Sequence, residues 1–142
     1  MSFVWVHESP ALWDAGKQAI VGGAPAGVFK MPKAAPGDLL SGEWWRAEKD
    51  GLVVGYGWLD TNWGGDAEVL LAVAPSARGT GAGTFILDQL EREAAAAGLN
   101  YLYNVVQPTH PDGEAVTHWL EKRRFKASDE GRLIRRVLAR PS

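Results

Sequence analysis

The residues with the clearest chemical potential lie in one stretch of the chain, residues 67–84. An apolar run at 67–74 ends at Pro75, and the sequence Arg-Gly-Thr-Gly-Ala-Gly follows at 78–83. Glycine lets the backbone approach a ligand closely, and the first turn of a helix offers unpaired N–H donors at its positive dipole end. The pattern therefore predicts an anion site that suits a phosphate or a pyrophosphate.

Two familiar nucleotide-binding motifs fail on spacing. A Walker loop needs a lysine followed by serine or threonine after its last glycine, whereas Ala82, Gly83 and Thr84 follow Gly81 here. A dinucleotide fingerprint needs glycine at the position of Thr84 and an acidic residue about 20 residues further on. The sequence has neither, so the anion belongs to another kind of ligand.

Residues 73–83 resemble the signature of the GNAT superfamily of CoA-dependent N-acetyltransferases. That signature reads Arg/Gln-x-x-Gly-x-Gly/Ala after a strand ending near Val-x-Pro, and this chain has Val-Ala-Pro at 73–75 and the glycine turn at 78–83. The resemblance implies a single domain over residues 1–142. It also implies an α/β fold (α+β, mixed sheet) with antiparallel N-terminal strands and a β-α-β crossover for the cofactor.

By this resemblance, acetyl-CoA lies in a splay between strands at 67–74 and 100–106. Its pantetheine pairs with the backbone of residues 71–73 like an added strand, and its pyrophosphate sits on the N–H groups of residues 78–84. The N–H of Val73 would polarise the thioester carbonyl. The implied cofactor-binding residues are Leu71, Ala72, Val73, Arg78, Gly79, Thr80, Gly81, Ala82, Gly83 and Thr84.

The chain departs from the family where the general acid is expected. Many members carry a tyrosine five residues before the phenylalanine of a Gly-Phe pair, and it protonates the leaving thiolate. Here Arg124 precedes Phe125 and Leu120 stands at the tyrosine position. The usual acid is therefore missing, with Tyr103 as an outside candidate, and Gly113 stands where an asparagine is often seen.

Two residues are candidates for the general base that deprotonates the amine. Glu68 lies in the cofactor strand, one residue from the position where some members keep a glutamate, so strand alternation needs a bulge to turn it into the cleft. The alternative is a strand-end carboxylate in solvent. His110 follows the last cofactor strand and titrates in the right range, but it also fits an exposed loop between two prolines.

These features favour an enzyme that transfers an acetyl or short acyl group from acetyl-CoA to a primary amine of a small molecule or peptide. Two alternatives stay open: a module that binds acyl-CoA without efficient catalysis, and an acyltransferase for a protein amine or a nucleic-acid base. The net charge of −2 argues against a general nucleic-acid binder. Residues 1–70 carry −4 and residues 71–142 carry +2, which fits an amine acceptor and an anionic cofactor, or chance surface charge.

Bulk composition fits a globular protein of the cytoplasm. The 142 residues include no cysteine, which excludes disulfides and thiolate metal sites, and no metal site is expected. The first ten residues lack the features of a secretory signal, and no apolar run is long enough for a membrane span. Cytoplasmic location and no membrane partner are therefore expected, and a homodimer is left open.

The elements that must position the site follow from hydrophobic patterning. Strands are expected at 3–6, 43–49, 52–59, 67–74, 100–106 and 132–138, with a hairpin turn at Asp50-Gly51. A helix is expected from Pro10 to about residue 20. A second should run over 82–97 with an apolar stripe ending at Ala97, closed by Gly98, and a third should be capped by Asp112.

Two groups of residues have competing interpretations. The four tryptophans of the meander are either core or an aromatic wall for the acceptor; they are Trp44, Trp45, Trp58 and Trp63. Eight basic residues between 122 and 140 are either a solvated face or a surface for the 3′-phosphate of CoA, a nucleic acid or an acidic partner.

Overall fold

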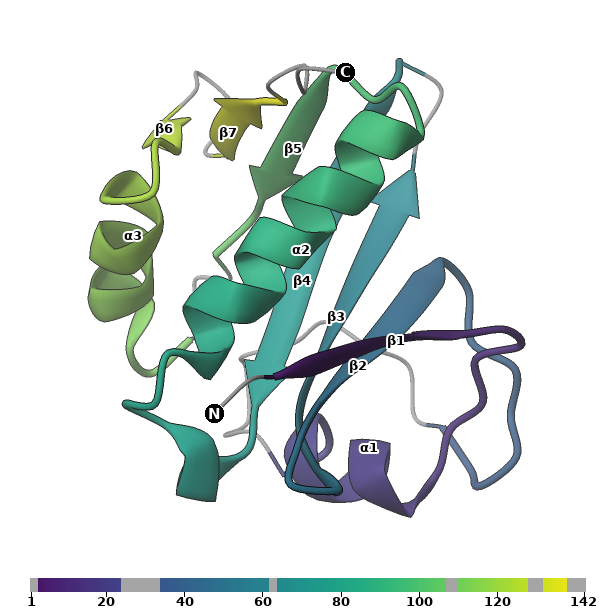
Figure 1. Cartoon of the computed structure of the whole chain (residues 1–142). Coiled ribbons are helices and arrows are strands. Elements are labelled where there is room, and N and C mark those ends of the chain that lie inside the picture. The colour runs from purple at the N-terminus through teal and green to yellow at the C-terminus, as the bar shows by residue number, and fades with distance from the viewer. Residues whose placement is uncertain (1–2, 24–33, 62–63, 107–109, 128–131, 138–142) are drawn as a thin grey trace.

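A computed structural model gives the fold and describes residues 3–23, 34–61, 64–106, 110–127 and 132–137. Its strands are β1 (Val4–Glu8), β2 (Glu43–Lys49), β3 (Leu52–Thr61), β4 (Asp66–Val73), β5 (Tyr101–Asn104), β6 (Lys126–Ala127) and β7 (Leu133–Arg136). They form one sheet in the order β1-β2-β3-β4-β5-β7-β6 (Figure 1). Among these strands β4 and β5 are the parallel pair, and the other neighbours are antiparallel.

The helices cover both faces of the sheet. They are α1 (Ala15–Ile20), a short 3₁₀ turn η1 (Pro75–Ala77), α2 (Ala82–Ala96) and α3 (Gly113–Glu121). Helix α2 connects β4 to β5 and packs with α3 on one face, while α1 lies on the other (Figure 1). The predicted mixed α/β fold, with an antiparallel front and one strand–helix–strand crossover, is confirmed.

The hairpin between β2 and β3 follows the predicted turn chemistry. Asp50 and Gly51 both have positive φ angles, 54° and 78°. Two-residue hairpin loops need this left-handed backbone, which Asp-Gly adopts at low cost. The predicted turn at these two positions is therefore confirmed.

Two glycines of β3 let α2 lie directly on the sheet. A Cβ placed on Gly55 would come within 2.7 Å of the Ala72 carbonyl oxygen and of the Ile86 side chain, and one on Gly57 would meet Ile86 and Leu90. Ile86 and Leu90 are fully buried at 0% exposure. The absence of side chains at these two positions of β3 thus sets how closely α2 approaches the sheet, and with it the position of its N-terminus.

Helix α2 ends as predicted, with one correction. Gly98 has φ 75°, and the N–H of Leu99 reaches back to the Ala94 carbonyl at 3.0 Å, which is a glycine-terminated helix end. Ala97, expected in the apolar stripe, is exposed because it is already the C-cap and the chain turns away from the sheet there.

Other boundaries differ from the sequence-based expectation. Helix α1 begins at Ala15 and not at Pro10, because the side chain of Asp14 accepts the N–H of Lys17 and so caps the helix there. The short strand β6 was not expected, since two residues carry no periodicity. The cofactor strand starts one residue earlier than expected and ends at Val73.

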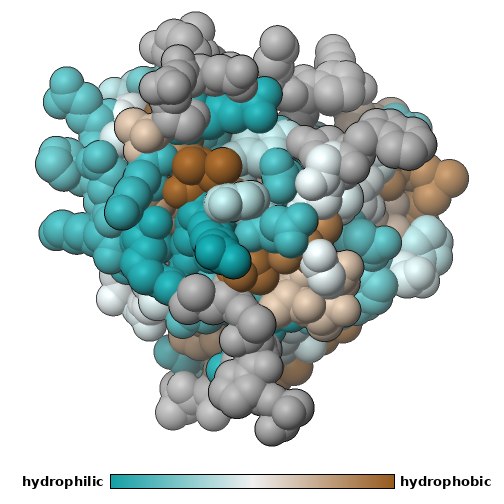
Figure 2. Space-filling view, turned by 90° about the horizontal axis from the view of Figure 1, so that it is seen from above, coloured by the Kyte–Doolittle hydropathy of each residue, from teal (hydrophilic) through white to brown (hydrophobic). Residues whose placement is uncertain are grey.

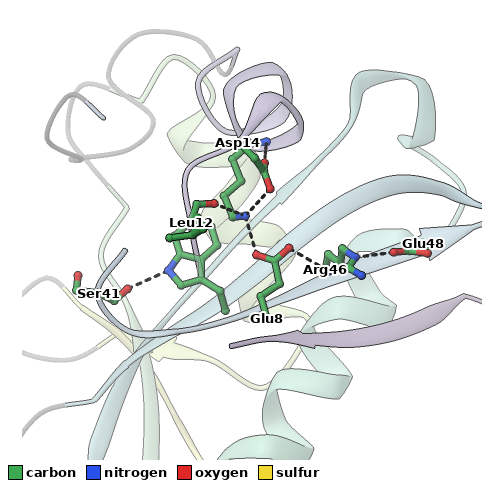
Figure 3. A network of polar contacts seen from close by, with 8 residues as sticks. Glu8, Leu12, Asp14, Ser41, Arg46 and Glu48 are labelled. Atoms are coloured by element: carbon green, nitrogen blue, oxygen red, sulfur yellow. Dashed lines mark hydrogen bonds and ion pairs between the residues drawn. The ribbon is translucent and has the colours of Figure 1, made fainter. Parts of the chain in front are cut away.

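Lys17 is the most deeply buried charge of the described chain. Its side chain is 0% exposed, and Nζ lies 2.6 Å from Glu8 Oε1 and 3.1 Å from Asp14 Oδ2. Nζ also donates to the carbonyl oxygen of Leu12 at 2.8 Å. Figure 3 shows this network, in which Glu8 also reaches Arg46 at 3.3 Å. Lys17 therefore ties β1, the following loop and the start of α1 together.

Lys17→Met should lower the free energy of unfolding by about 3–5 kcal/mol, because it leaves the Glu8 carboxylate without its buried partner. Urea unfolding followed by circular dichroism measures this change. The matched control Lys122→Met removes an exposed lysine and should cost less than about 0.5 kcal/mol. The double variant Lys17→Met with Glu8→Gln should recover part of the loss. A cost for Lys17→Met as small as that of the control would contradict this role.

No helix in the described part of the chain is both long and apolar enough to span a membrane. Figure 2 views the molecule from above Figure 1 and shows a face that is largely hydrophilic, with small separate hydrophobic patches.

Candidate active site

The glycine turn between η1 and α2 presents an open backbone surface. Gly79 and Gly81 have φ angles of 78° and 88°, and a Cβ at either position would meet nothing within 4 Å. Gly81 is the N-cap of α2 and provides no capping side chain. The N–H groups of the first helical turn therefore remain available to an anion, at the positive end of a 15-residue helix.

Strands β4 and β5 separate beside this turn. They pair over residues 66–68 and 101–103. Further along, the backbone pairing is replaced by the side-chain amide of Asn104, whose Nδ2 donates to the Val69 carbonyl at 2.8 Å. The N–H of Ala74 donates to the Val54 carbonyl on β3. Since antiparallel hydrogen bonds alternate, the N–H groups of Leu71 and Val73 point away from β3, into the gap between β4 and β5.

One cleft of about 1350 Å³ joins the turn and the strand gap. All of the predicted site residues line it except Thr80, whose hydroxyl donates to the Ala77 carbonyl. The lining also includes the loop at residues 38–41 and the side of α3. An elongated ligand with a pyrophosphate at the glycine turn and an extended chain along β4 fits the residues that are present.

Glu68 lies on the face of β4 opposite to α2, together with Leu70 and Ala72. Strands β3 and β4 keep one register from Gly55–Val73 to Thr61–Ala67, so this strand pair has no bulge of the kind that Glu68 was expected to need. Glu68 lines the cleft without a bulge, because the cleft opens on the face that normal alternation gives it. Its side chain is half-buried there.

A second carboxylate stands directly across from Glu68. Asp60 is its partner in the β3–β4 register and also lines the cleft. Burial raises the pKa of Glu68 and the negative charge of Asp60 raises it further, while Arg132 lowers it in part. A carboxylate with a raised pKa is a better proton acceptor than one in water.

His110 also lines the cleft, at the entrance to α3. Its Nδ1 accepts the N–H of Asp112 at 2.9 Å, so the hydrogen of the neutral ring lies on Nε2. His110 lies in the loop before α3 and is partly exposed.

The place of the family tyrosine is apolar and buried. Leu120 is 4% exposed and packs in the core with Phe125 and α2. Tyr103, the outside candidate for the acid, is not part of the cleft lining and lies under the guanidinium of Arg132, 4.9 Å from ring centroid to Cζ. Among the described residues, His110 is the histidine that lines the cleft.

The tryptophans of the meander are core residues. Trp44 and Trp58 are 1% and 4% exposed and stack at 4.1 Å on the α1 face, where they form the floor of the cleft. Trp45 is buried on the α2 face, and Trp63 lies outside the described residues. Core packing is confirmed for these three tryptophans.

Sequence reasoning did not single out three residues that line the cleft, although Arg123 belongs to the basic group for which a CoA phosphate was considered: Asp60, Trp119 and Arg123. Asp60 is found only once the β3–β4 register is known. Trp119 packs 3.4 Å from the position of a Cβ on Gly83, and Arg123 reaches Thr84, so both depend on how α3 docks against α2. No local sequence pattern reports such contacts.

Comparison with known proteins agrees with this geometry. A family model described as acetyltransferase (GNAT) family matches residues 25–125, and the chain belongs to this family. No curated protein matches the chain in sequence.

Solved structures share the fold. An N-acetyltransferase from Staphylococcus aureus Mu50 is 22% identical, with 68% of each chain covered and a TM-score of 0.57. A GNAT phosphinothricin acetyltransferase from Sinorhizobium meliloti, in complex with AcCoA, is 21% identical over 68% of this chain and 61% of that chain, TM-score 0.53. An N-acetylglutamate synthase from Neisseria gonorrhoeae, complexed with coenzyme A and L-arginine, is 24% identical over 66% of this chain and 24% of that one, TM-score 0.58.

Proposed function

We propose that this chain transfers an acetyl or another short acyl group from acetyl-CoA to a primary amine of a small molecule or peptide, by direct attack in a ternary complex. The observation that carries the proposal is a single cleft with three features. They are the N–H groups of the glycine turn at 78–84 (the anion cradle), the N–H groups of Leu71 and Val73, and the half-buried carboxylate of Glu68. Membership of the acetyltransferase family, and solved structures of the same fold that hold AcCoA or CoA, support this donor.

The backbone of residues 71–84 would hold the donor. The N–H groups at the start of α2 would bind its pyrophosphate, with Arg78 at the rim of the cleft. The outward N–H groups of Leu71 and Val73 would bind its extended arm as an added strand. When bound, acetyl-CoA supplies an acyl group already activated as a thioester.

Two groups of the chain would act on the reacting atoms. The N–H of Val73 would donate to the thioester oxygen, where negative charge develops during attack. Glu68 would remove the proton from the incoming ammonium or amine, a role that its raised pKa and its place in the cleft support. Holding both reactants in one cleft contributes the rest through positioning.

The departing thiolate must regain a proton, and Leu120 offers none. His110, when protonated to the imidazolium, would deliver it directly or through water and return to the neutral ring, because its partly exposed side chain lines the same cleft. The apolar residue at 120 equally supports a second candidate function, a domain that binds acyl-CoA and catalyses poorly.

A panel of primary amines separates the two functions. Release of free CoA thiol is followed with acetyl-CoA and each amine, including diamines, aromatic amines, amino acids and peptide N-termini, and the acetylated product is identified by mass spectrometry. The proposal expects at least one amine with saturable turnover. CoA binding without turnover on any amine would favour the binding module.

A further inference from the structure

Arg123 lies at the end of α3 and reaches the first turn of α2. Its Nη2 donates to Thr84 Oγ1 at 2.9 Å and its Nη1 donates to the Trp119 carbonyl at 3.0 Å. The guanidinium stacks on the Trp119 ring, with Cζ 3.9 Å from the ring centroid. Three contacts thus fix the guanidinium at the wall of the cleft, beside the anion cradle.

The charge at this place has the unfavourable sign for the apo-protein. A cation beside a helix N-terminus is repelled by the helix dipole, and Arg78 adds a further positive charge to the same cleft. No carboxylate among the described residues forms an ion pair with Arg123, and its buried Nε–H has no hydrogen-bond partner there. An anion placed between the helix start and Arg123 would compensate all of these charges.

The neighbouring basic residues have other surroundings. Arg124 and Arg135 both pair with Glu91 on α2, far along the helix from the glycine turn. Among the described basic residues after position 121, Arg123 is the one that lines the cleft. The described part of the basic C-terminal segment therefore contributes a single guanidinium to the site.

We propose that Arg123 is a phosphate-positioning residue that binds the pyrophosphate of CoA together with the N–H groups of the glycine turn. The inference rests on the proposed function. It assigns the pyrophosphate and not the 3′-phosphate, because the guanidinium is held by Thr84, which belongs to the same helical turn as the N–H donors. A planar guanidinium suits two phosphoryl oxygens at once.

Calorimetric titration of CoA and of 3′-dephospho-CoA into wild type, Arg123→Ala, Arg123→Lys and the matched surface variant Lys122→Ala tests this assignment. Arg123→Ala should weaken both ligands by the same factor, roughly 10- to 100-fold. Arg123→Lys should recover only part of the loss, since it keeps the charge without the fork. Lys122→Ala should bind as wild type does, and the melting temperatures of the unliganded variants report whether α3 stays docked.

Three results would overturn the proposal, each in a distinct way. Wild-type affinity in Arg123→Ala would remove Arg123 from the site. A loss seen with CoA but absent with 3′-dephospho-CoA would place Arg123 on the 3′-phosphate. Full recovery by lysine would reduce its role to a general charge. Failure of wild type itself to bind CoA would instead contradict the proposed function.

Discussion

Gly81→Asp should abolish CoA binding while the protein remains folded. Gly81 caps α2 with φ 88°, and a Cβ there meets nothing within 4 Å, so the new side chain enters open space in the cleft. Aspartate tolerates the left-handed backbone better than most residues do. Its carboxylate, however, would stand where the pyrophosphate is expected and repel it.

The structure offers a matched control at the other end of the same helix. Gly98 also has a positive φ, 75°, with nothing within 4 Å of its Cβ position, and it does not line the cleft. Gly98→Asp should therefore carry a similar backbone cost and leave CoA affinity unchanged. Calorimetry measures affinity and circular dichroism verifies the fold. A folded Gly81→Asp protein that binds CoA as wild type does would refute the placement of the site.

Glu68→Gln should lower turnover by roughly 10²–10⁴-fold at neutral pH, with little change in CoA affinity. The amide keeps the shape of the side chain but accepts no proton. The deficit should shrink as pH rises, because more of the amine is then unprotonated without help from the enzyme. Steady-state rates from pH 6 to 9, with the best amine of the panel, measure both effects.

The raised pKa of Glu68 also predicts how kcat/KM changes with pH. Glu68 acts as base only when ionised, so kcat/KM should rise as the pH increases through this raised pKa. This rise is one limb of the pH–rate profile, and deprotonation of the amine gives a separate limb at higher pH. Asp60→Asn removes the negative charge across the strand pair, which lowers the pKa of Glu68 and shifts this limb to lower pH. An unmoved limb would show that Glu68 is not the group that titrates.

His110→Ala tests whether His110 protonates the leaving thiolate. If His110 delivers the proton to the thiolate, its loss should slow turnover without moving the limb assigned to Glu68. Rates within about threefold of wild type for both Glu68→Gln and His110→Ala, across the pH range, would leave positioning as the main contribution of the protein.

Local sequence patterns were sufficient for the elements that carry the cofactor cradle. The glycine turn, the start of α2, its end at Gly98 and the hairpin at Asp50-Gly51 all depend on backbone angles that the residues themselves favour. Such signals are short-range and survive in any tertiary context. For this reason these elements followed from the sequence, while the course of the cofactor along the strand at 67–74 came from the family resemblance.

The side chains that meet across elements were not accessible in this way. Asp60 faces Glu68 because of strand register, and Arg123 meets Thr84 because α3 docks on α2. The burial of Lys17 likewise depends on Glu8 from another element. The place of Glu68 in the cleft without a bulge was hidden for the same reason, since the family position alone did not reveal which side chains of β4 line the cleft.

Titration of acetyl-CoA into the wild-type protein tests the central claim most directly. Calorimetry should give a dissociation constant in the micromolar range, and the melting temperature should rise with ligand concentration. At 100 times the dissociation constant, mass action adds roughly 2.7 kcal/mol to the free energy of unfolding. The absence of both a heat of binding and a thermal shift at millimolar acetyl-CoA would contradict the assignment of this cleft as a CoA site.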